Sequence, residues 1–346
     1  MSSLSKTVLL LLVVASVGII GAGPAKKTDD TAKLNAEIRE SSQVIFWRDP
    51  TDVATRNLLY GQGGEAHQPH GTFTFDQEDL DGTNPKFTVR DQDGVKWKAK
   101  LGTEARPETA ASRLLWAAGY YANEDYFVPA IHVTNIPAHL HRGQKYVDPD
   151  GTVHDVRMKR YLKGEKKIGD WDWETGPFAG TRELNGLRTL MAVINNWDLK
   201  DVNNAIYEEK PKEGSGALQV YTISDLGASF GTAGLSRTHE ISKGNPKSYS
   251  HSKFIKRVDS ETVDFDSPGR AALIDIADPK EYARRLKLEW IGRNIPRADA
   301  RWMGQLLAKL SPQQIRDAFR AAGYSPEEVE EFAVILEERI GELNKL

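Results

Sequence analysis

Cysteine is absent from this chain of 346 residues. The protein therefore has no disulfide bond, no lipid-modified cysteine at its N-terminus and no cysteine-bound zinc. Histidine is present, with His139 and His141 at strand spacing and His67 and His70 flanking a loop. No cysteine or close acidic partner completes a zinc-binding set with them, so we interpret these histidines as solvated loop residues.

Long runs of like charge are also missing, and the net charge is only −3 at pH 7. A charge balance of this kind gives no basic region that would bind nucleic acid and no cluster of basic residues that would bind a membrane surface. We therefore expect no nucleic-acid partner. The sequence also contains no Gly-x-Ser-x-Gly nucleophile elbow and no Walker lysine, which excludes two common kinds of catalytic site.

One apolar segment stands near the N-terminus, at residues 7–23, with an uninterrupted hydrophobic part at 8–20. This part is short for a membrane-spanning helix and fits the hydrophobic region of a signal peptide. Gly23 and Ala25 are spaced for cleavage before Lys26, although Pro24 lies between them. We expect residues 1–25 to be a signal peptide or an uncleaved membrane anchor. The protein is then exported to the periplasm or beyond the cell, or held at the membrane.

Residues 26–70 are polar and loop-like, and we interpret them as a linker with an N-terminal extension. After them the pattern becomes that of β-strands. The stretches 71–77 and 86–91 alternate polar and apolar residues, as does 95–102. In the last of these, one face carries apolar residues and the other carries lysines at 96, 98 and 100. Further short strands are predicted at 126–133, 153–162, 205–210 and 218–227.

Helical periodicity follows at 107–118 and 181–196, and the chain beyond about residue 270 is predicted to be helical. Ser311 and Ser325 each precede a proline, and Gln314 and Glu328 stand three residues after them. This spacing predicts two capping boxes at two helix starts. We therefore predict an α+β, two-lobed fold, with a β-rich lobe at 71–163 and a mostly helical lobe at 164–346.

Several residues follow the order that phosphoryl transfer requires. That reaction needs a lysine held by an acidic partner, oxygen ligands for Mg²⁺, and a carboxylate that orients the attacking hydroxyl. A lysine ends the strand at 95–102, and a glutamate begins the next helix. The helix at 181–196 leads into WDLKDVN (197–203), and the strand at 218–227 ends in SDLG (224–227).

These motifs resemble those of protein kinases. WDLKDVN is similar to the catalytic loop, whose common form is RDLKPEN, and SDLG is similar to the Asp-Phe-Gly element. The stretch around Lys100 and Glu108 is similar to the kinase strand lysine and its helix glutamate. Over residues 71–310 the chain most resembles the divergent kinase-like families of the HipA, phosphoinositide-kinase and CotH types.

The resemblance implies roles for the two motifs, with ATP and Mg²⁺ as cofactors. Asp198 would orient the attacking hydroxyl, and Lys200 would contact the γ-phosphate. Asn203 and Asp225 would hold magnesium. Asn196 and Trp197 stand where the family has His-Arg.

The resemblance also implies a nucleotide site in the β-rich part. Lys100 would contact the α- and β-phosphates and pair with Glu108, and Gly82 would lie in a loop over the phosphates. Lys98 is the competing lysine, and we favour Lys100 because it stands at the strand end nearest the helix. The glycine loop has one glycine where the family has three, and no Ala-Pro-Glu ends an activation segment.

Each motif in isolation has an ordinary structural interpretation. Asp-x₄-Asn fits a solvated turn, and Asp-Leu-Gly consists of common turn residues. Lys100 fits the exposed face of an edge strand, and Glu108 fits the first turn of a helix. The pair Trp171 and Trp173 could form a ligand platform or a loop packed on the core.

Three functions remain open. The first is an atypical kinase that transfers the ATP γ-phosphoryl group to a hydroxyl of a protein, lipid or sugar. The second is a catalytically inactive, kinase-like binding or scaffold protein of the cell envelope. The third is nucleotidyl transfer to a protein side chain. For the first function we predict that Lys100, Asp198, Asn203 and Asp225 converge on one cleft.

Overall fold

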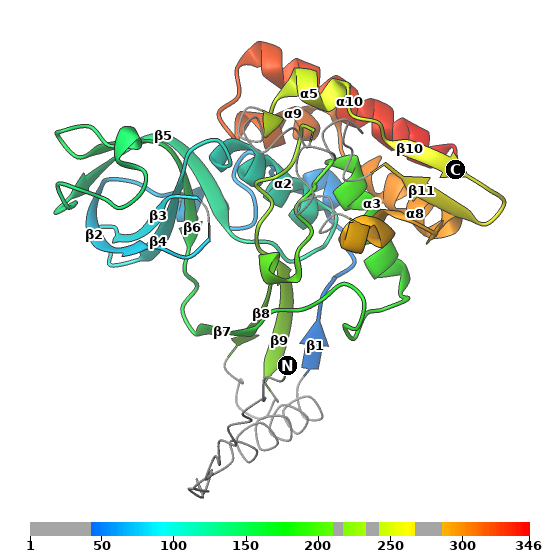
Figure 1. Ribbon diagram of the computed structural model, residues 1–346, viewed down its shortest axis with the longest axis horizontal. Helices are drawn as coiled ribbons and strands as arrows, with labels where there is room; N and C mark the ends of the chain where they lie inside the picture. Colours follow the sequence, from blue (N-terminus) through cyan, green and yellow to red (C-terminus); the bar gives the residue numbers. More distant parts are fainter. Residues whose placement is uncertain (1–42, 83, 210–216, 233–241, 267–285) are drawn as a thin grey trace, which may run out of the picture. The chain divides into compact units, whose positions relative to one another are not determined.

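The computed structural model describes residues 43–346, apart from residue 83 and the segments 210–216, 233–241 and 267–285 (Figure 1). The predicted signal or anchor at 1–25, and residues 26–42 of the predicted linker and extension (26–70), lie outside the described residues. In the described part of that range, Phe46, Val53 and Leu58 are buried in the hydrophobic core. Residues 43–346 form one compact unit. Within its described part, no helix has both the length and the apolar character needed to cross a bilayer.

The first layer of the fold is a closed β-barrel with the strand order β2-β3-β4-β6-β5. Its strands are β2 (Thr72–Asp79), β3 (Lys86–Arg90), β4 (Lys96–Leu101), β5 (Asp125–Thr134) and β6 (Thr152–Arg160). Parallel pairing of β2 with β5 closes it. The predicted alternation in β4 is confirmed, because Trp97, Ala99 and Leu101 are buried in the barrel core. The lysines between them lie on the outer face.

Helix α2 (Ala105–Ala117) follows β4 and joins the barrel to the helical part of the chain. It contacts β5 and β6 of the barrel and also the distant helix α9 (Pro312–Arg320). Almost every residue of α2 is buried, including Glu108 near its start. The predicted helix at 107–118 is therefore confirmed, and its acidic first turn lies inside the protein.

Two further sheets occur in the described residues. The first has the order β1-β9-β8-β7 and the second β10-β11-β12. The strands of the first are β1 (Gln43–Ile45), β9 (Leu218–Ile223), β8 (Asn204–Glu209) and β7 (Glu165–Gly169). The second contains β10 (Ile255–Val258), β11 (Thr262–Phe265) and β12 (Ile295–Pro296). Strands β8 and β9 were predicted, whereas the other five are short and were not.

The other helices of the described residues are α3 (Arg182–Val193), α5 (Pro246–Ser250), α8 (Arg297–Leu307), α9 and α10 (Pro326–Asn344). Short 3₁₀ turns lie at Val53–Thr55, Glu65–His67, Gln144–Tyr146, Asp201–Asn203 and Glu289–Gly292. Both predicted capping boxes are present, at Ser311 with Gln314 and at Ser325 with Glu328. The fold is α+β, with sheets in both halves of the chain.

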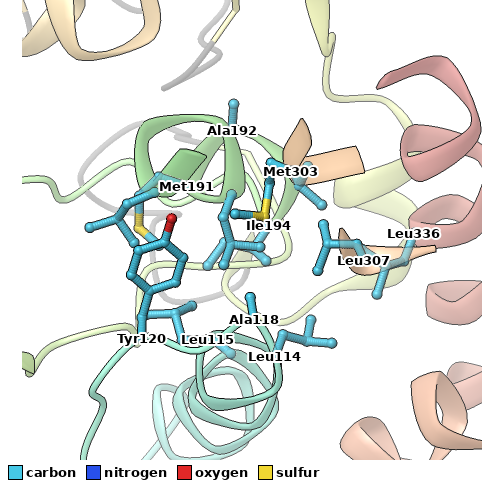
Figure 2. Packing of buried hydrophobic residues seen from close by; sticks show 14 of the residues in the cluster. Leu114, Leu115, Ala118, Tyr120, Met191, Ala192, Ile194, Met303, Leu307 and Leu336 are labelled. Carbon is cyan, nitrogen blue, oxygen red and sulfur yellow. The ribbon is translucent and has the colours of Figure 1, made fainter. Parts of the chain in front are cut away.

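The large hydrophobic core lies among the helices (Figure 2). Leu114 and Leu115 of α2 face Met191 of α3, Leu307 of α8 and Leu336 of α10. This packing fixes α2 against the helical part, because a buried leucine is stabilised by about 1.5–3 kcal/mol relative to exposure.

Trp171 and Trp173 are also buried in this core, and the Nε1–H of Trp171 donates to the carbonyl of Thr222 at 3.1 Å. The tryptophan pair therefore belongs to the core.

Candidate functional site

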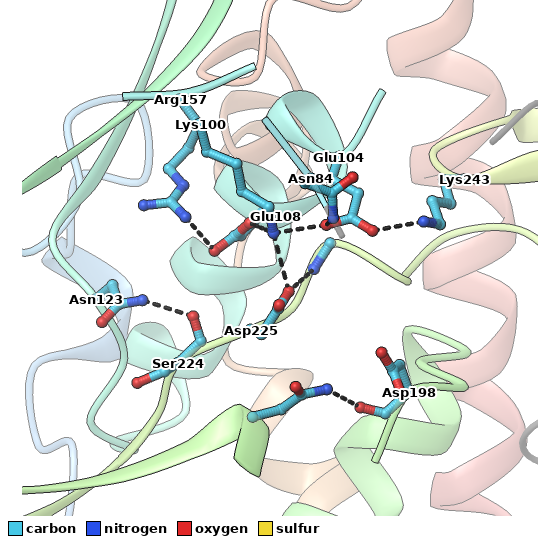
Figure 3. A network of polar contacts seen from close by, with 12 residues as sticks. Asn84, Lys100, Glu104, Glu108, Asn123, Arg157, Asp198, Ser224, Asp225 and Lys243 are labelled. Atoms are coloured by element: carbon cyan, nitrogen blue, oxygen red, sulfur yellow. Dashed lines mark hydrogen bonds and ion pairs between the residues drawn. The ribbon is translucent and has the colours of Figure 1, made fainter. Parts of the chain in front are cut away.

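The pairing of β4 with β6 places Lys100 opposite Arg157. Both side chains point away from the barrel interior, because Leu101 and Val156 next to them occupy the barrel core. Helix α2 packs against β6 and brings Glu108 between the two cations. The Nζ of Lys100 donates to Oε2 of Glu108 at 2.8 Å, and Nη2 of Arg157 lies 2.8 Å from Oε1 (Figure 3).

Arg157 has a second carboxylate partner, since its Nη1 donates to Oδ1 of Asp125 at 3.2 Å. All four side chains of this group are at least 95% buried. Burial raises the pKa of Glu108 to about 7, although Arg157 and Lys100 oppose this rise. Burial alone would lower the pKa of Arg157, but Asp125 and Glu108 raise it above its usual value. Both cations are therefore held in the charged form next to Glu108.

Lys100 also reaches the second predicted motif, because its Nζ donates to Oδ1 of Asp225 at 3.1 Å. Burial alone would lower the pKa of Lys100. The carboxylates of Asp225, Glu108 and Glu104 outweigh burial and raise that pKa well above the usual range. The lysine end of β4 and the aspartate after β9 thus meet in one place.

Glu104 is a member of this site that the sequence motifs did not indicate. It occupies the N-cap position of α2, and its Oε2 lies 2.5 Å from Nζ of Lys100. Its Oε1 lies 2.5 Å from Nζ of Lys243, and Asn84 donates to Oε2 at 2.6 Å. Burial alone would raise the pKa of Glu104, but Lys100 and Lys243 lower it well below its usual value. The spacing of four between Lys100, Glu104 and Glu108 was the available sequence signal.

Asp225 is held by the segment that contains Asn203. The backbone N–H groups of Ser224 and Asp225 both donate to the carbonyl oxygen of Asn203, at 2.9 and 3.0 Å. Asn123, which precedes β5, donates from its amide to the carbonyl of Ser224 at 2.6 Å. The N–H of Gly227 donates to Oδ1 of Asp225 at 3.3 Å. These bonds orient a carboxylate that remains 39% exposed.

The loop from Asn196 to Asn203 is organised by its own side chains. The Oδ1 of Asn196 accepts from the N–H of Asp198 at 2.9 Å. The amide Nδ2 of Asn203 donates to the carbonyl of Asp198 at 2.6 Å, which turns the Asn203 amide oxygen away from that carbonyl. Asn196 thus supports the loop at one of the two positions where the kinase pattern has His-Arg.

Asp198 and Lys200 form an ion pair of 2.6 Å, and both side chains are about one-third exposed. The loop is anchored to the segment after Asp225, because the N–H of Trp197 donates to the carbonyl of Ala228 at 3.2 Å. Figure 3 shows Asp198 on the segment next to Asp225. Of the four predicted side chains, those of Lys100 and Asp225 are in direct contact, whereas Asn203 and Asp198 are linked to them through backbone groups. Convergence of all four side chains on one cleft stays a prediction.

Two predicted positions lie apart from this chain of contacts. Lys98 pairs with Asp79 at 2.9 Å on the outer face of the barrel. Gly82 lies in the loop between β2 and β3 with a φ of 63°, and its carbonyl accepts from Arg142. The loop reaches Lys100 through Asn84, by way of Glu104.

The donor set can be compared with what a magnesium ion requires. Mg²⁺ prefers oxygen ligands, commonly one or two carboxylates completed by substrate oxygens and water. Asp225 and Asn203 offer a carboxylate and an amide oxygen on adjacent segments, which fits this preference. The carboxylate oxygens of Glu104, Glu108 and Asp225 also lie within 4.8 Å of one another. The ammonium of Lys100 already contacts all three of these groups, and Lys243 and Arg157 are further cationic partners of Glu104 and Glu108.

Comparisons with known proteins give one distant likeness. No protein-family model and no curated protein matches the chain. Among solved structures, it is similar to a crystal structure of the proinflammatory kinase CtkA of Helicobacter pylori, with a TM-score of 0.41 and 10% sequence identity. The alignment covers 80% of this chain and 98% of that chain. At this level of similarity, the function has to be inferred from the contacts of the site.

Proposed function

We propose that this protein is a kinase-like phosphotransferase that uses ATP and Mg²⁺ to phosphorylate a hydroxyl group. The observation that carries the proposal is the continuous chain of contacts from Lys100 through Asp225 and Asn203 to Asp198. The side chains of Lys100 and Asp225 meet directly, and backbone carbonyl groups of Asn203 and Asp198 link the segments of these two residues to Asp225. Phosphoryl transfer is catalysed mainly by positioning and electrostatic stabilisation, for which these groups are suited.

Each side chain then has one task. Lys100 binds oxygens of the α- and β-phosphates, and Glu108 with Arg157 fixes its position. Asp225 and Asn203 would hold Mg²⁺, which would neutralise negative charge on the phosphates. Asp198 orients the acceptor hydroxyl and takes its proton as the new oxygen–phosphorus bond forms. The bond from the γ-phosphorus to ADP breaks, and Lys200 stabilises the transferred group.

The acceptor is a hydroxyl of a protein, a lipid or a sugar. The apolar segment at residues 7–23 supports a location outside the cytoplasm or at the membrane, where the acceptor would also be found.

A non-catalytic scaffold of the cell envelope is the second candidate. It is favoured by one observation, namely that three carboxylates already surround Lys100.

A transfer assay tests the proposal. Full-length protein is incubated with Mg²⁺ and ATP labelled at the γ-phosphate, and labelled products and modified side chains are identified by mass spectrometry. We expect phosphoryl transfer from the wild type and at least a hundredfold less from Asp198→Asn, because general base catalysis contributes about 10²–10⁴-fold. An adduct that carries the nucleotide would indicate nucleotidyl transfer, and equal activity of Asp198→Asn would refute the assigned role.

A further inference from the structure

The ammonium group of Lys100 is saturated by carboxylates. A lysine ammonium has three N–H donors. Glu104, Glu108 and Asp225 lie 2.5, 2.8 and 3.1 Å from its Nζ. If this lysine binds nucleotide phosphates, as in the proposed function, each phosphate oxygen that it contacts must replace a carboxylate.

The three carboxylates differ in their freedom to leave. Glu108 is 1% exposed, and its other oxygen is held by Arg157 at 2.8 Å, so it is fixed. Asp225 is 39% exposed, and in the proposed function it turns toward the metal. That movement frees one donor, whereas contacts to both an α- and a β-phosphate oxygen need two. Glu104 is therefore the second group that must release Lys100.

Glu104 has another cation available. Its Oε1 lies 2.5 Å from Nζ of Lys243, while its Oε2 contacts Lys100. A rotation of this one side chain removes Oε2 from Lys100 and leaves the ion pair with Lys243 intact. Gly227 provides the space for the present position of the Glu104 side chain, because a Cβ at residue 227 would lie 2.6 Å from Oε2 of Glu104.

We propose that Glu104 competes with nucleotide phosphates for Lys100, and that nucleotide binding breaks the contact of Glu104 with Lys100 and leaves Glu104 paired with Lys243 alone. Asn84 in the β2–β3 loop contacts the same oxygen that leaves, so this movement also releases this loop. Glu104 thereby couples occupation of the phosphate site to the loop before β3 and to the segment that contains Lys243. Its role is that of a positioning residue.

Nucleotide affinity of the full-length protein, measured by calorimetry, tests this role. The ligands are Mg·ATP and adenosine, which lacks phosphates. Glu104→Gln removes the competing charge and is expected to bind Mg·ATP about tenfold more tightly or better, since a charge-assisted hydrogen bond contributes about 1.5–3 kcal/mol. Its adenosine affinity is expected to stay within about twofold of the wild type.

Two controls separate competition at Lys100 from a change in overall charge. Glu104→Asp keeps the charge but is one methylene too short to span Lys100 and Lys243, so it is expected to tighten Mg·ATP binding as well. Asp155→Asn removes a carboxylate whose ion pair, at 3.4 Å, is with Arg106 and not with Lys100. Its affinity for Mg·ATP is expected to match that of the wild type.

The outcomes distinguish this inference from the proposed function. The competition is overturned if both Glu104 variants bind Mg·ATP with wild-type affinity, or if Asp155→Asn tightens Mg·ATP binding equally. Either result leaves the phosphotransferase proposal standing. Failure of the wild type and all variants to bind Mg·ATP at millimolar concentrations overturns both. If circular dichroism shows that the Glu104 variants do not fold, Lys243→Met replaces them. That variant is expected to bind Mg·ATP severalfold more weakly with unchanged adenosine affinity, and no change overturns the inference.

Discussion

The backbone N–H of Asp225 donates to the carbonyl oxygen of Asn203 at 3.0 Å. The two residues belong to different motifs and are separated in the chain by the whole of strands β8 and β9. Because β8 and β9 pair in antiparallel register, with Asn204 opposite Ile223, the start of one strand and the end of the other meet. The hairpin therefore brings the two predicted metal ligands to one place.

Lys100 and Lys98 are predicted to differ in their effect on nucleotide binding. Lys100→Met should abolish Mg·ATP binding and lower the free energy of unfolding by about 3–5 kcal/mol, because the buried carboxylates of Glu104 and Glu108 each lose one of their two cations. Lys98→Met should bind nucleotide normally. Its free energy of unfolding should fall by about 1 kcal/mol or less, since the ion pair of Lys98 with Asp79 is partly exposed. Calorimetry and urea unfolding measure both quantities. Loss of binding in Lys98→Met alone would show that the wrong lysine was assigned.

Arg157 is predicted to be a structural residue of the site. It is 5% exposed and is the shared partner of Glu108 and Asp125. Arg157→Met should lower the free energy of unfolding by about 3–5 kcal/mol, because two buried carboxylates lose a partner. Arg90→Met, on strand β3 of the same barrel, is the matched control, since Arg90 is half exposed and lies 4.0 Å from Asp76. Arg90→Met should lower the free energy of unfolding by about 1 kcal/mol or less. Similar losses of unfolding free energy in the two variants would contradict the structural role of Arg157.

The faces of β4, the existence of α2 and the two capping boxes were predictable because their signals are local. Alternation in β4 placed Trp97 inside the barrel, and the serine–proline pairs marked the starts of α9 and α10. The closure of the barrel by β2 and β5 was not predictable in this way, because it depends on pairing between strands far apart in sequence. Strands of two to five residues, such as β12 and β7, carry too short a pattern to recognise.

The same distinction applies to the site. Lys100, Asp198, Asn203 and Asp225 could be predicted as site residues because they belong to short motifs in a recognisable order. Arg157 was missed because its role follows from its register opposite Lys100 on β6. Glu104 was missed because an acidic residue near a helix start has an ordinary explanation in the helix dipole. Its contact with Lys243 is set by tertiary packing.

Stability should depend on pH through Glu104. Lys100 and Lys243 lower the pKa of this carboxyl from its reference value of 4.5, even though burial acts in the opposite direction. A carboxyl with a lowered pKa in the folded state contributes stability above its unfolded pKa, and this contribution is lost as the pH falls through the folded pKa. The destabilisation caused by Glu104→Gln should therefore be constant above about pH 5 and shrink below pH 4.5. Denaturant unfolding of the wild type and Glu104→Gln at a series of pH values measures this destabilisation. A stability difference between the two proteins that grows as the pH falls would contradict the lowered pKa of Glu104.

The most direct test of the account is the thermal stability of the full-length protein with and without Mg·ATP, for the wild type and Asp225→Ala. A ligand that binds only the native state stabilises it by about 2.7 kcal/mol at a hundredfold excess over its Kd. We predict a magnesium-dependent rise of the melting temperature in the wild type that is lost in Asp225→Ala, while the variant without ligand still unfolds cooperatively. No rise in the wild type at millimolar nucleotide, or an equal rise in Asp225→Ala, would contradict the assignment of this site to a metal–nucleotide complex.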